Sequence, residues 1–470
     1  MRNFPKAFFS LNFLYLLLIA AQVAAIIFLC LYIPSFLPMA AAFAIIWLLT
    51  AIAACILFTR DGAAEVKCAW FVLIAALPVA GALIYLFATI KKKPHGVLKV
   101  NAPNARGIAG AANLTCGTCE AGYDRAQYFK DGAAFFTAAL NEIESAKKRV
   151  YLEFYIIGRG HFFTALLNAL EKAKANGAEI RIILDGMGSA FRVNRKEFKK
   201  LKAAGAEVKI FHRLTPLPRA KLNFRDHRKI VAVDGKVAFT GGINFADEYA
   251  NIGSPYGYWK DNGVAVYGEA AKIFEGMFLS EWNGSHEMDA PEGGKYKCLP
   301  YYDSPPYRTF CEDAYVYAIN NATERVHILT PYFCLSGKTH AALSFAAKRG
   351  VDVKIIIPHI PDKKYAYAIS KSYAAELTKC GVKFYTYTPG FMHAKSLICD
   401  SRAFLGSYNF DYRSTHFNFE CGVCFDGEIA TEAERDFEEC LSLSAPLTSE
   451  KIAPHRRFCR FILKLFAPLI

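Results

Sequence analysis

The chain has 470 residues, of which 53% are hydrophobic, and its mean hydropathy of +0.17 is high for a soluble protein. This length allows two or three domains with ample cores, and the net charge of +14 predicts anionic partners, either nucleic acid or anionic lipid. Fourteen cysteines are scattered along the chain, which argues against a disulfide scaffold, and we expect them to be mostly reduced.

The N-terminal part is the most apolar region of the chain. Uncharged apolar stretches cover residues 11–33, 38–58 and 68–90. Each reaches the roughly 20 residues that a helix needs to cross the hydrocarbon core of a bilayer. We therefore expect residues 1–93 to form a membrane anchor with two or three transmembrane helices. A cleaved signal peptide followed by two spans is the alternative, because Arg2 and Lys6 precede the first stretch.

A run of lysines, residues 91–93, ends the third stretch and predicts that the domain after it is cytoplasmic. Three spans would then place Arg2 and Lys6 outside, so the first stretch could instead be a re-entrant or interfacial helix. The third stretch contains Pro78 and Gly81, which a transmembrane helix tolerates where neighbours satisfy the backbone.

Residues 94–124 are rich in Gly, Ala and Asn, and we expect a linker there. This region contains Cys116 and Cys119, a CxxC pair that could be redox-active or half of a zinc site. A second such pair is Cys421 and Cys424, but residues three apart in a strand face opposite sides. We expect both pairs to be structural.

Strand and helix patterns alternate after the linker. Amphipathic helices are predicted at residues 135–148 and 164–175, and buried strands at residues 150–157 and 180–185. The pattern then repeats, with strands at residues 326–333 and 351–358 and a helix at residues 339–348. We therefore expect an α/β fold with two duplicated α/β/α halves, residues 125–290 and 291–454, each a parallel or mixed sheet covered by helices.

Residues 455–470 are expected to form a separate basic amphipathic helix. One face of the helical wheel carries Phe458, Phe461, Ile462, Leu465 and Phe466, and the other carries Arg456, Arg457, Arg460 and Lys464. A purely basic polar face is typical of a helix that lies on anionic lipid. An ordinary helix packed on the domain is the alternative.

Each half contains a His-x-Lys motif followed by Asp and then by Gly and Asn. The first copy is HRKIVAVDGKVAFTGGIN at residues 227–244, and the second is HAKSLICDSRAFLGSYN at residues 393–409. Two copies of one pattern indicate a shared site on a pseudo-two-fold axis. The second copy is one residue shorter after Asp400 than the first is after Asp234, which predicts a shorter hairpin turn.

These residue types suit chemistry at a phosphoryl group. Two lysines can neutralise its oxygens, two asparagines can donate hydrogen bonds, and small residues after the strands let backbone N–H groups approach. One histidine can attack phosphorus while the other protonates the leaving oxygen, and this two-step route needs no cofactor or metal. In a strand, His and Lys two residues apart point to the same face.

The remaining motif residues have supporting roles in this scheme. Asp234 and Asp400 belong to the motif, but we expect them to hold the turn at the end of the strand. A carboxylate must fix the tautomer of each histidine, and Glu248 and Glu420 follow the two asparagines. The candidate catalytic residues are His227, Lys229, Asp234, His393, Lys395 and Asp400; the phosphate-binding candidates are Asn244, Asn409, Gly242 and Ser407; the histidine-orienting candidates are Glu248 and Glu420.

The paired motifs resemble the HxKxxxxD signature of the phospholipase D superfamily, and the wider sequence resembles its bacterial cardiolipin synthase branch. The similar phrases cover nearly the whole chain and include WFVLIAALPVAGALIYL, ILDGMGS, NFRDHRKIVAVDGKVAFTGGINFADEY, YWKDNGVAVYG, ILTPYF, RGVDVKIIIP, MHAKSLICD and GSYNFDYRSTHFNFE. The resemblance implies two phospholipase D-like halves in a multi-pass protein of the bacterial cell membrane. It also implies transfer of a phosphatidyl group between two phosphatidylglycerol molecules, with release of glycerol.

By similarity, His227 would be the nucleophile and His393 the acid/base, although the order could be reversed. The expected partners are phosphatidylglycerol and anionic membrane lipid rather than nucleic acid, and the oligomeric state is open. A phospholipid hydrolase with the same site is the nearest alternative, followed by a synthase that uses phosphatidylethanolamine or a glycolipid as second substrate. A nuclease is disfavoured by the membrane spans, and a non-catalytic scaffold by the two intact His-x-Lys pairs.

Overall fold

The computed structural model describes residues 21, 22, 24, 27, 36–60, 63–89, 96–101, 119–189, 192–213, 223–305, 310–448 and 454–469. The chain divides into two compact units. The first comprises residues 1–93, 213–224 and 461–470, and the second comprises residues 94–212 and 225–460. The expected apolar span at residues 11–33 lies almost entirely outside the described residues.

The first unit contains the apolar helix α2 (Phe36–Thr59), which matches the second expected span. Within the described residues, its segment Ala40–Thr59 is the one stretch long and apolar enough to cross a membrane. Multi-pass insertion is therefore not supported by the described helices.

The third expected span, residues 68–90, is wrong: two short helices, α3 (Ala64–Ala76) and α4 (Pro78–Thr89), replace it. Pro78 has no N–H and disfavours a helical residue before it, and Leu77 accordingly leaves the helix with φ −133°. Helices of 13 and 12 residues are about 20 Å long, well short of the ~30 Å hydrocarbon core. The two helices pack together instead, because a Cβ at position 81 would lie 2.6 Å from the Leu73 carbonyl, and only glycine permits this approach.

The basic C-terminal segment is helical, as expected, in α14 (Pro454–Phe466) followed by η5 (Ala467–Leu469). The side chains of residues 454–459 lie outside the described set. Phe461 is 62% exposed, whereas Ala467 is 4% exposed, and η5 contacts α3. The end of the tail is thus packed against a helix of the first unit, while the apolar side chain of Phe461 stays free.

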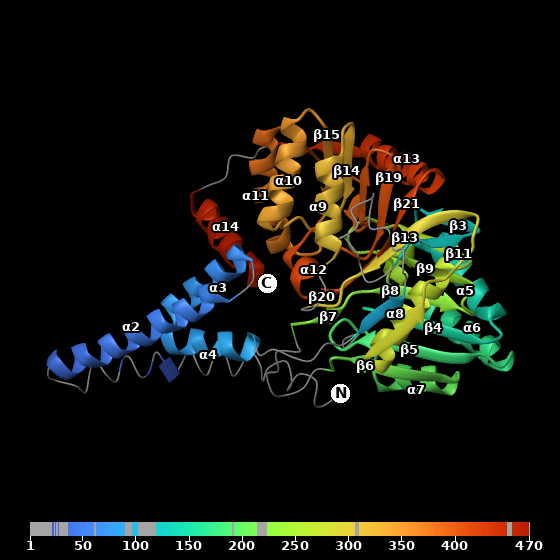
Figure 1. The fold of residues 1–470 in the computed structure, drawn as a ribbon, viewed down its shortest axis with the longest axis horizontal. Coiled ribbons are helices and arrows are strands. Elements are labelled where there is room, and N and C mark those ends of the chain that lie inside the picture. Colours follow the sequence, from blue (N-terminus) through green and yellow to red (C-terminus); the bar gives the residue numbers. More distant parts are fainter. Residues whose placement is uncertain are drawn as a thin grey trace. The chain divides into compact units, whose positions relative to one another are not determined.

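The second unit is built on two mixed sheets that repeat one strand order (Figure 1). The first sheet runs in the order β3 (Arg125–Phe129), β11 (Gly263–Tyr267), β9 (Val237–Gly241), β8 (Lys229–Val233), β4 (Arg149–Phe154), β5 (Glu179–Asp185) and β6 (Ala206–Phe211). The second runs in the order β2 (Ala121–Tyr123), β13 (Tyr296–Tyr302), β21 (Cys421–Asp426), β19 (Arg402–Gly406), β18 (Ser396–Cys399), β14 (Arg325–Leu329), β15 (Asp352–Pro358), β16 (Lys383–Tyr387) and β22 (Ser444–Pro446).

Helices cover the two sheets in matching positions. In the first half they are α5 (Gly132–Ser145), α6 (His161–Ala175), α7 (Arg195–Ala203) and α8 (Ala270–Asn283), with the 3-10 turn η3 (Asp247–Ala250). In the second half they are α9 (Cys311–Asn321), α10 (Gly337–Lys348), α11 (Lys364–Leu377), α12 (Tyr412–His416) and α13 (Glu428–Ser442), with η4 (Thr378–Cys380). Leu152 of β4 belongs to the core that includes Phe135 and Phe136 of α5. Its neighbour Tyr151 stacks on Phe278 of α8, so helices cover both faces of this sheet.

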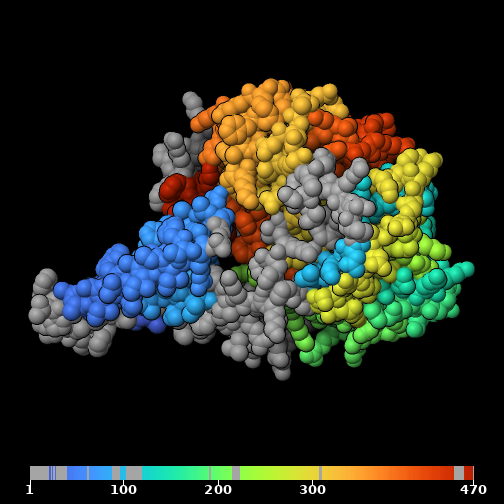
Figure 2. Space-filling model, viewed as in Figure 1, coloured from blue at the N-terminus to red at the C-terminus, as the bar shows by residue number. Residues whose placement is uncertain are grey.

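The expected linker, residues 94–124, contains two strands. β1 (Val97–Asn101) pairs in parallel with β12 (Ser285–Asp289), and the two lie side by side on the face drawn in Figure 2, β1 in light blue and β12 in yellow. β2 pairs with β13 and extends the sheet of the second half. Gly- and Ala-rich composition alone did not reveal these strands, because their partners lie far away in sequence.

The two halves are joined by two short parallel strand pairs. β7 (Arg225–Asp226) pairs with β20 (Asn418–Phe419), and β10 (Tyr258–Lys260) pairs with β17 (Gly390–Met392). Each pair takes one strand from each half. Beside them, Lys260 Nζ lies 2.7 Å from Asp436 Oδ2 of α13, and both side chains are buried. One strand of each pair, β7 or β17, ends immediately before a motif histidine.

Candidate active site

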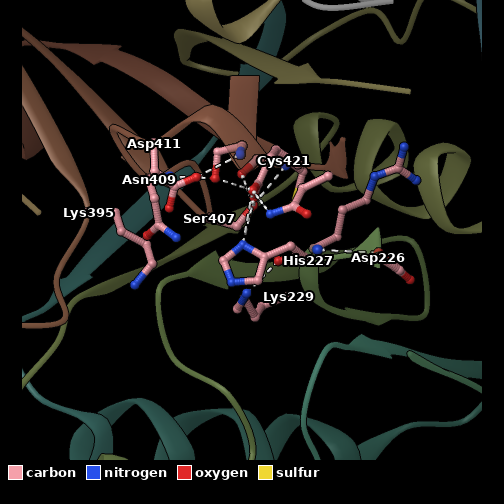
Figure 3. A network of polar contacts seen from close by, with 12 residues as sticks. Asp226, His227, Lys229, Lys395, Ser407, Asn409, Asp411 and Cys421 are labelled. Carbon is pink, nitrogen blue, oxygen red and sulfur yellow. Dashed lines mark hydrogen bonds and ion pairs between the residues drawn. The ribbon is translucent and has the colours of Figure 1, made fainter. Parts of the chain in front are cut away.

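His227 follows β7 directly, and its imidazole is held by a carboxylate of the other half. The N–H of His227 donates to the carbonyl of Phe419 at 2.9 Å, which extends the β7–β20 pair by one residue. Nδ1 of His227, whose ring is labelled in Figure 3, consequently lies 3.0 Å from both carboxylate oxygens of Glu420. Glu420 is fully buried, so the Nδ1–H tautomer is favoured and Nε2 is left for chemistry.

His393 has the equivalent arrangement in the second half. It follows β17, and its N–H donates to the carbonyl of Lys260 at 2.7 Å. Its Nδ1 lies 2.6 Å from Asp261 Oδ2, and Asp261 is fully buried in the first half. Tyr249 and Trp259 pack around the ring, with centroids 5.2 and 5.0 Å away. Each histidine is therefore oriented by a carboxylate from the opposite half.

The expectation for Glu248 is wrong. Its carboxylate pairs with Arg192 at 2.9 Å instead of with a histidine. Asp261 has the orienting role instead, and a comparison of the two repeats could have found it. Asp261 lies two residues before Gly263, as Glu420 lies two residues before Gly422. These two glycines pair with Gly241 and Gly406, respectively.

Gly242 and Ser407 do not present free backbone N–H groups to a phosphate. Their N–H groups donate to the carbonyls of Asn262 and Cys421, at 3.0 and 2.8 Å. Both residues support the orienting carboxylates instead. A Cβ at Gly242 would lie 2.1 Å from Asp261 Oδ1, whereas the Ser407 hydroxyl donates to Glu420. This explains why one copy of the motif has Gly where the other has Ser.

Lys229 begins β8 and Lys395 directly precedes β18, and both ammonium groups are buried. Lys229 Nζ donates to the carbonyl of His227, and Lys395 Nζ lies 2.5 Å from the carbonyl of His393 and 3.3 Å from its Nε2. Arg228, between the first pair, points away and donates to the carbonyl of Asp303 at 2.8 Å. His and Lys therefore share one face, as expected from their spacing.

The two asparagines differ in their hydrogen bonds. Asn244 is 1% exposed; its Oδ1 accepts from the N–H of Ile156 at 3.0 Å and its Nδ2 donates to the hydroxyl of Tyr249 at 2.6 Å. Asn409 is 4% exposed, and its Oδ1 has no hydrogen-bond partner among the described residues. Asn244 is thus largely engaged by the scaffold, whereas the amide of Asn409 is available to a ligand.

Asp234 and Asp400 hold the chain and do not reach the site. Asp234, at φ 55°, accepts backbone N–H groups from residues 147–149. Asp400, at φ 53°, accepts those of residues 323–325. The turn between β18 and β19 is one residue shorter than that between β8 and β9, because Cys399 pairs with Arg402 but Val233 with Val237. Asp400 keeps its contacts despite the shorter turn.

Asp234→Ala is expected to destabilise the fold and leave the chemistry intact. The variant loses three charge-assisted hydrogen bonds and places alanine in a left-handed conformation, which together cost roughly 2–4 kcal/mol. Urea denaturation would measure the loss, and activity per folded molecule should match that of the wild-type protein. A stable but inactive variant would contradict the structural role.

Burial sets the protonation of the site. It lowers the pKa of Lys229 to about 7 and that of Lys395 to about 8. It lowers the pKa of His227 and, with the charge of Lys395, that of His393 to about 3. The charge of Lys395 also lowers the pKa of His227, and the charge of Lys229 lowers that of His393. The site therefore holds two neutral imidazoles beside two amines that are poised to gain or lose a proton.

Anion binding is expected to weaken as pH rises through these lysine pKa values. Below about pH 7 both amines are protonated and attract an oxyanion; above about pH 8 both lose their charge. Affinity for sulfate, whose charge is constant in this range, should fall roughly tenfold between about pH 6 and about pH 9, or about 1.4 kcal/mol. Calorimetric titration would measure it, with the Lys229→Met, Lys395→Met double variant as the control. Equal affinity at both pH values would contradict the assignment.

A group outside this site has the geometry to hold a metal ion. His327, Glu434 and Glu438 place potential ligand atoms within 4.8 Å of one another. Arg325 lies 3.5 Å from Glu434, and Lys354 lies 3.9 Å from Glu438. These cations already neutralise the carboxylates, so we assign no metal role to the group.

The described cysteines are free thiols. Cys421 and Cys424 are buried in β21, and burial raises the pKa of Cys421 to about 11, which keeps it a neutral thiol. The first CxxC pair cannot be placed, because Cys116 lies outside the described residues.

The paired geometry agrees with comparisons to known proteins. The family described as "Cardiolipin synthase, PLD-like domain" matches residues 139–282 and 315–441, one block in each half. The chain belongs to this family of the phospholipase D superfamily. Its fold is accordingly the phospholipase D-like α/β fold with two repeated halves.

Similar proteins are found in several bacteria. Cardiolipin synthases of Oceanobacillus iheyensis and Listeria monocytogenes are 32% identical over 359 residues and 30% identical over 363 residues. Both alignments cover 73% of this chain, and they cover 74% and 75% of those synthases. An uncharacterized protein of Streptococcus mutans is 36% identical over 363 residues, covering 73% of this chain and 78% of that protein.

A solved structure supports the fold. The phosphatidylserine synthase of Haemophilus influenzae superimposes with a TM-score of 0.56 at 14% identity. The match covers 73% of this chain and 93% of that one. At this identity the likeness supports the shared fold and leaves the substrate to be argued from the site.

Proposed function

We propose that this protein is a cardiolipin synthase that transfers a phosphatidyl group from one phosphatidylglycerol to a second, with release of glycerol. The observation that carries the proposal is the pair of histidines, one from each half, each held through Nδ1 by a buried carboxylate of the other half. Two lysines beside them supply positive charge for a phosphodiester. Membership of the cardiolipin synthase family supports the choice of substrate.

In the first step, Nε2 of His227 attacks phosphorus. The bond between phosphorus and the glycerol oxygen breaks, and His393 donates a proton to that oxygen, giving glycerol and a phosphatidyl-histidine. His393 must be protonated for this step, and an anionic phosphodiester against its ring favours that state. Glu420 stabilises the positive charge that develops on His227.

In the second step, a hydroxyl of another phosphatidylglycerol attacks the same phosphorus. His393 accepts the hydroxyl proton, the phosphorus–nitrogen bond breaks, and cardiolipin leaves with His227 restored. In both steps the phosphoryl oxygens are bound by Lys229, Lys395 and Asn409. Asn244 supports the site through its hydrogen bonds to Ile156 and Tyr249. The reverse assignment exchanges the two histidines and leaves the other roles unchanged.

We further propose that the protein acts at a bacterial membrane, with its catalytic unit on the cytoplasmic side. Helix α2 supplies a segment of spanning length, and the lysines at residues 91–93 favour the cytoplasmic side for the chain that follows. The basic residues of the C-terminal segment suit anionic lipid. Both substrates of the proposed reaction are themselves anionic lipids.

The reaction is tested with purified full-length protein and phosphatidylglycerol vesicles, with and without EDTA. Mass spectrometry should find one cardiolipin and one glycerol for every two phosphatidylglycerol molecules consumed. Phosphatidic acid as the sole lipid product would identify a hydrolase, in which water resolves the intermediate. Failure to consume phosphatidylglycerol would overturn the proposed function.

A further inference from the structure

The two halves of the site differ at one position beside the catalytic residues. Ile157 and Phe333 occupy equivalent places, because each forms a bridge to the phenylalanine after the motif asparagine, Phe245 and Phe410. The residue before each therefore corresponds, and it is Ile156 in the first half but Tyr332 in the second. The first half presents an apolar side chain where the second presents a hydroxyl.

Tyr332 is part of a polar pair that the first half lacks. Its hydroxyl donates to Oδ2 of Asp362 at 2.5 Å. Oδ1 of Asp362 is buried and has no hydrogen-bond partner among the described residues. The same holds for Oδ1 of Asn409, whereas the equivalent oxygen of Asn244 accepts a backbone N–H. Two acceptor atoms of the second half are thus unfilled.

This pair lies beside the second His-Lys motif. β14 pairs Leu329 with Ser396, the residue after Lys395, and Tyr332 follows Leu329 by three residues. The Phe333–Phe410 bridge brings Tyr332 close to Asn409 and Asp411, and Figure 3 shows both of those residues near Lys395. The negative charges of Asp411 and Asp362 favour the protonated form of the Lys395 amine, that is, they raise its pKa.

Unfilled acceptors beside a phosphoryl site indicate a ligand group that carries hydrogen-bond donors. A phosphodiester has none, and leaving a buried acceptor unpaired is unfavourable. Alcohol hydroxyls can fill such positions. A positively charged headgroup such as ethanolamine also offers donors, but the nearby Lys395 disfavours it.

We propose that Asp362 and Tyr332, together with Asn409, recognise the hydroxyl groups of a polyol headgroup on the second-half side of the site. The inference rests on the proposed function and names glycerol hydroxyls as the selected chemistry. The glycerol that leaves in the first step would then lie on the side of His393. The attacking hydroxyl of the second lipid would occupy the same place in the second step. That placement agrees with His393 as the acid/base and His227 as the nucleophile.

Internal competition between two headgroups tests this inference. Vesicles carry equal amounts of phosphatidylglycerol and phosphatidylpropanol, which lacks both free hydroxyls of the glycerol headgroup, and phosphatidylglycerol serves as acceptor for both. The initial rates of glycerol and propanol release give the ratio of the two kcat/KM values directly. The wild-type ratio should favour glycerol by roughly 10- to 100-fold, because unpaired polar groups penalise the analogue.

Two variants and a matched control complete the test. Asp362→Asn and Tyr332→Phe should each lower the ratio at least fivefold. Tyr151→Phe should not change it, because Tyr151 makes a similar bond to Glu179, at 3.0 Å, outside the site. A wild-type ratio near one, or variants that keep the wild-type ratio, would overturn the inference while cardiolipin formation continues. A wild-type protein that releases neither alcohol would overturn the proposed function as well.

Discussion

His227→Ala and His393→Ala should each lower kcat for cardiolipin formation by roughly 10³-fold or more. The first removes the atom that bonds to phosphorus, and the second removes the proton donor of one step and the proton acceptor of the other. Residues that act as a unit give large losses singly and little further loss together. The double variant should therefore be about as inactive as either single variant, in a radiolabelled phosphatidylglycerol assay.

His161→Ala is the matched control, because His161 is exposed at the start of α6. It should keep near wild-type activity. Mixing full-length His227→Ala and His393→Ala proteins should not restore turnover, since one chain supplies both histidines and both carboxylates. Full activity in either single variant, or recovery on mixing, would contradict a site contained within one chain.

The cross-half carboxylates should have the next largest effect. Glu420→Gln and Asp261→Asn keep the shape of the side chains but remove the charge that holds each histidine through Nδ1. An imidazole in the wrong orientation or the wrong tautomer should lower kcat by roughly 100-fold or more, while KM changes little. Steady-state kinetics over a range of phosphatidylglycerol concentrations would separate the two constants.

Glu248→Gln provides the control for this experiment. Glu248 occupies the place in sequence that matches an orienting role, yet its carboxylate contacts Arg192. The variant should retain activity within about threefold of wild type, as is usual for substitutions away from such features. Loss of activity in Glu248→Gln, together with normal activity in Asp261→Asn, would reverse the assignment.

Periodic patterns predicted much of the catalytic unit. Buried strands and amphipathic helices have a strong local signal, and the strands predicted at residues 150–157, 180–185, 326–333 and 351–358 correspond to β4, β5, β14 and β15. The spacing also predicted that His227 and Lys229 share a face and that the turn after Asp400 is shorter. These features depend on residues close together in the chain.

The features that could not be predicted depend on contacts between distant segments. β7 and β20 are two residues long and have no periodic signal, yet they bring Glu420 to His227. Its place shortly after Asn244 suggested Glu248 as an orienting carboxylate, whereas the pairing of β10 with β17 brings Asp261 to His393. Only a comparison of the two copies, acid-x-Gly in each, could have found it.

The apolar N-terminal region shows the opposite limitation. The apolar composition predicted a span at residues 68–90. Composition does not show that Pro78 ends α3, nor that Gly81 lets α4 fold back on it. The choice between a span and a helical hairpin rests on single residues. The C-terminal helix was predicted because its apolar and basic residues follow a 3.6-residue period.

The central claim, a shared site in which the two histidines have different roles, is tested most directly by trapping the intermediate. Wild-type protein would be mixed with phosphatidylglycerol, quenched during turnover in alkaline detergent to preserve the phosphoramidate, digested and analysed by mass spectrometry. We predict a phosphatidyl group on the peptide that contains His227, and no such label in the His227→Ala variant. A label on any other residue, or none in protein that still forms cardiolipin, would contradict the mechanism.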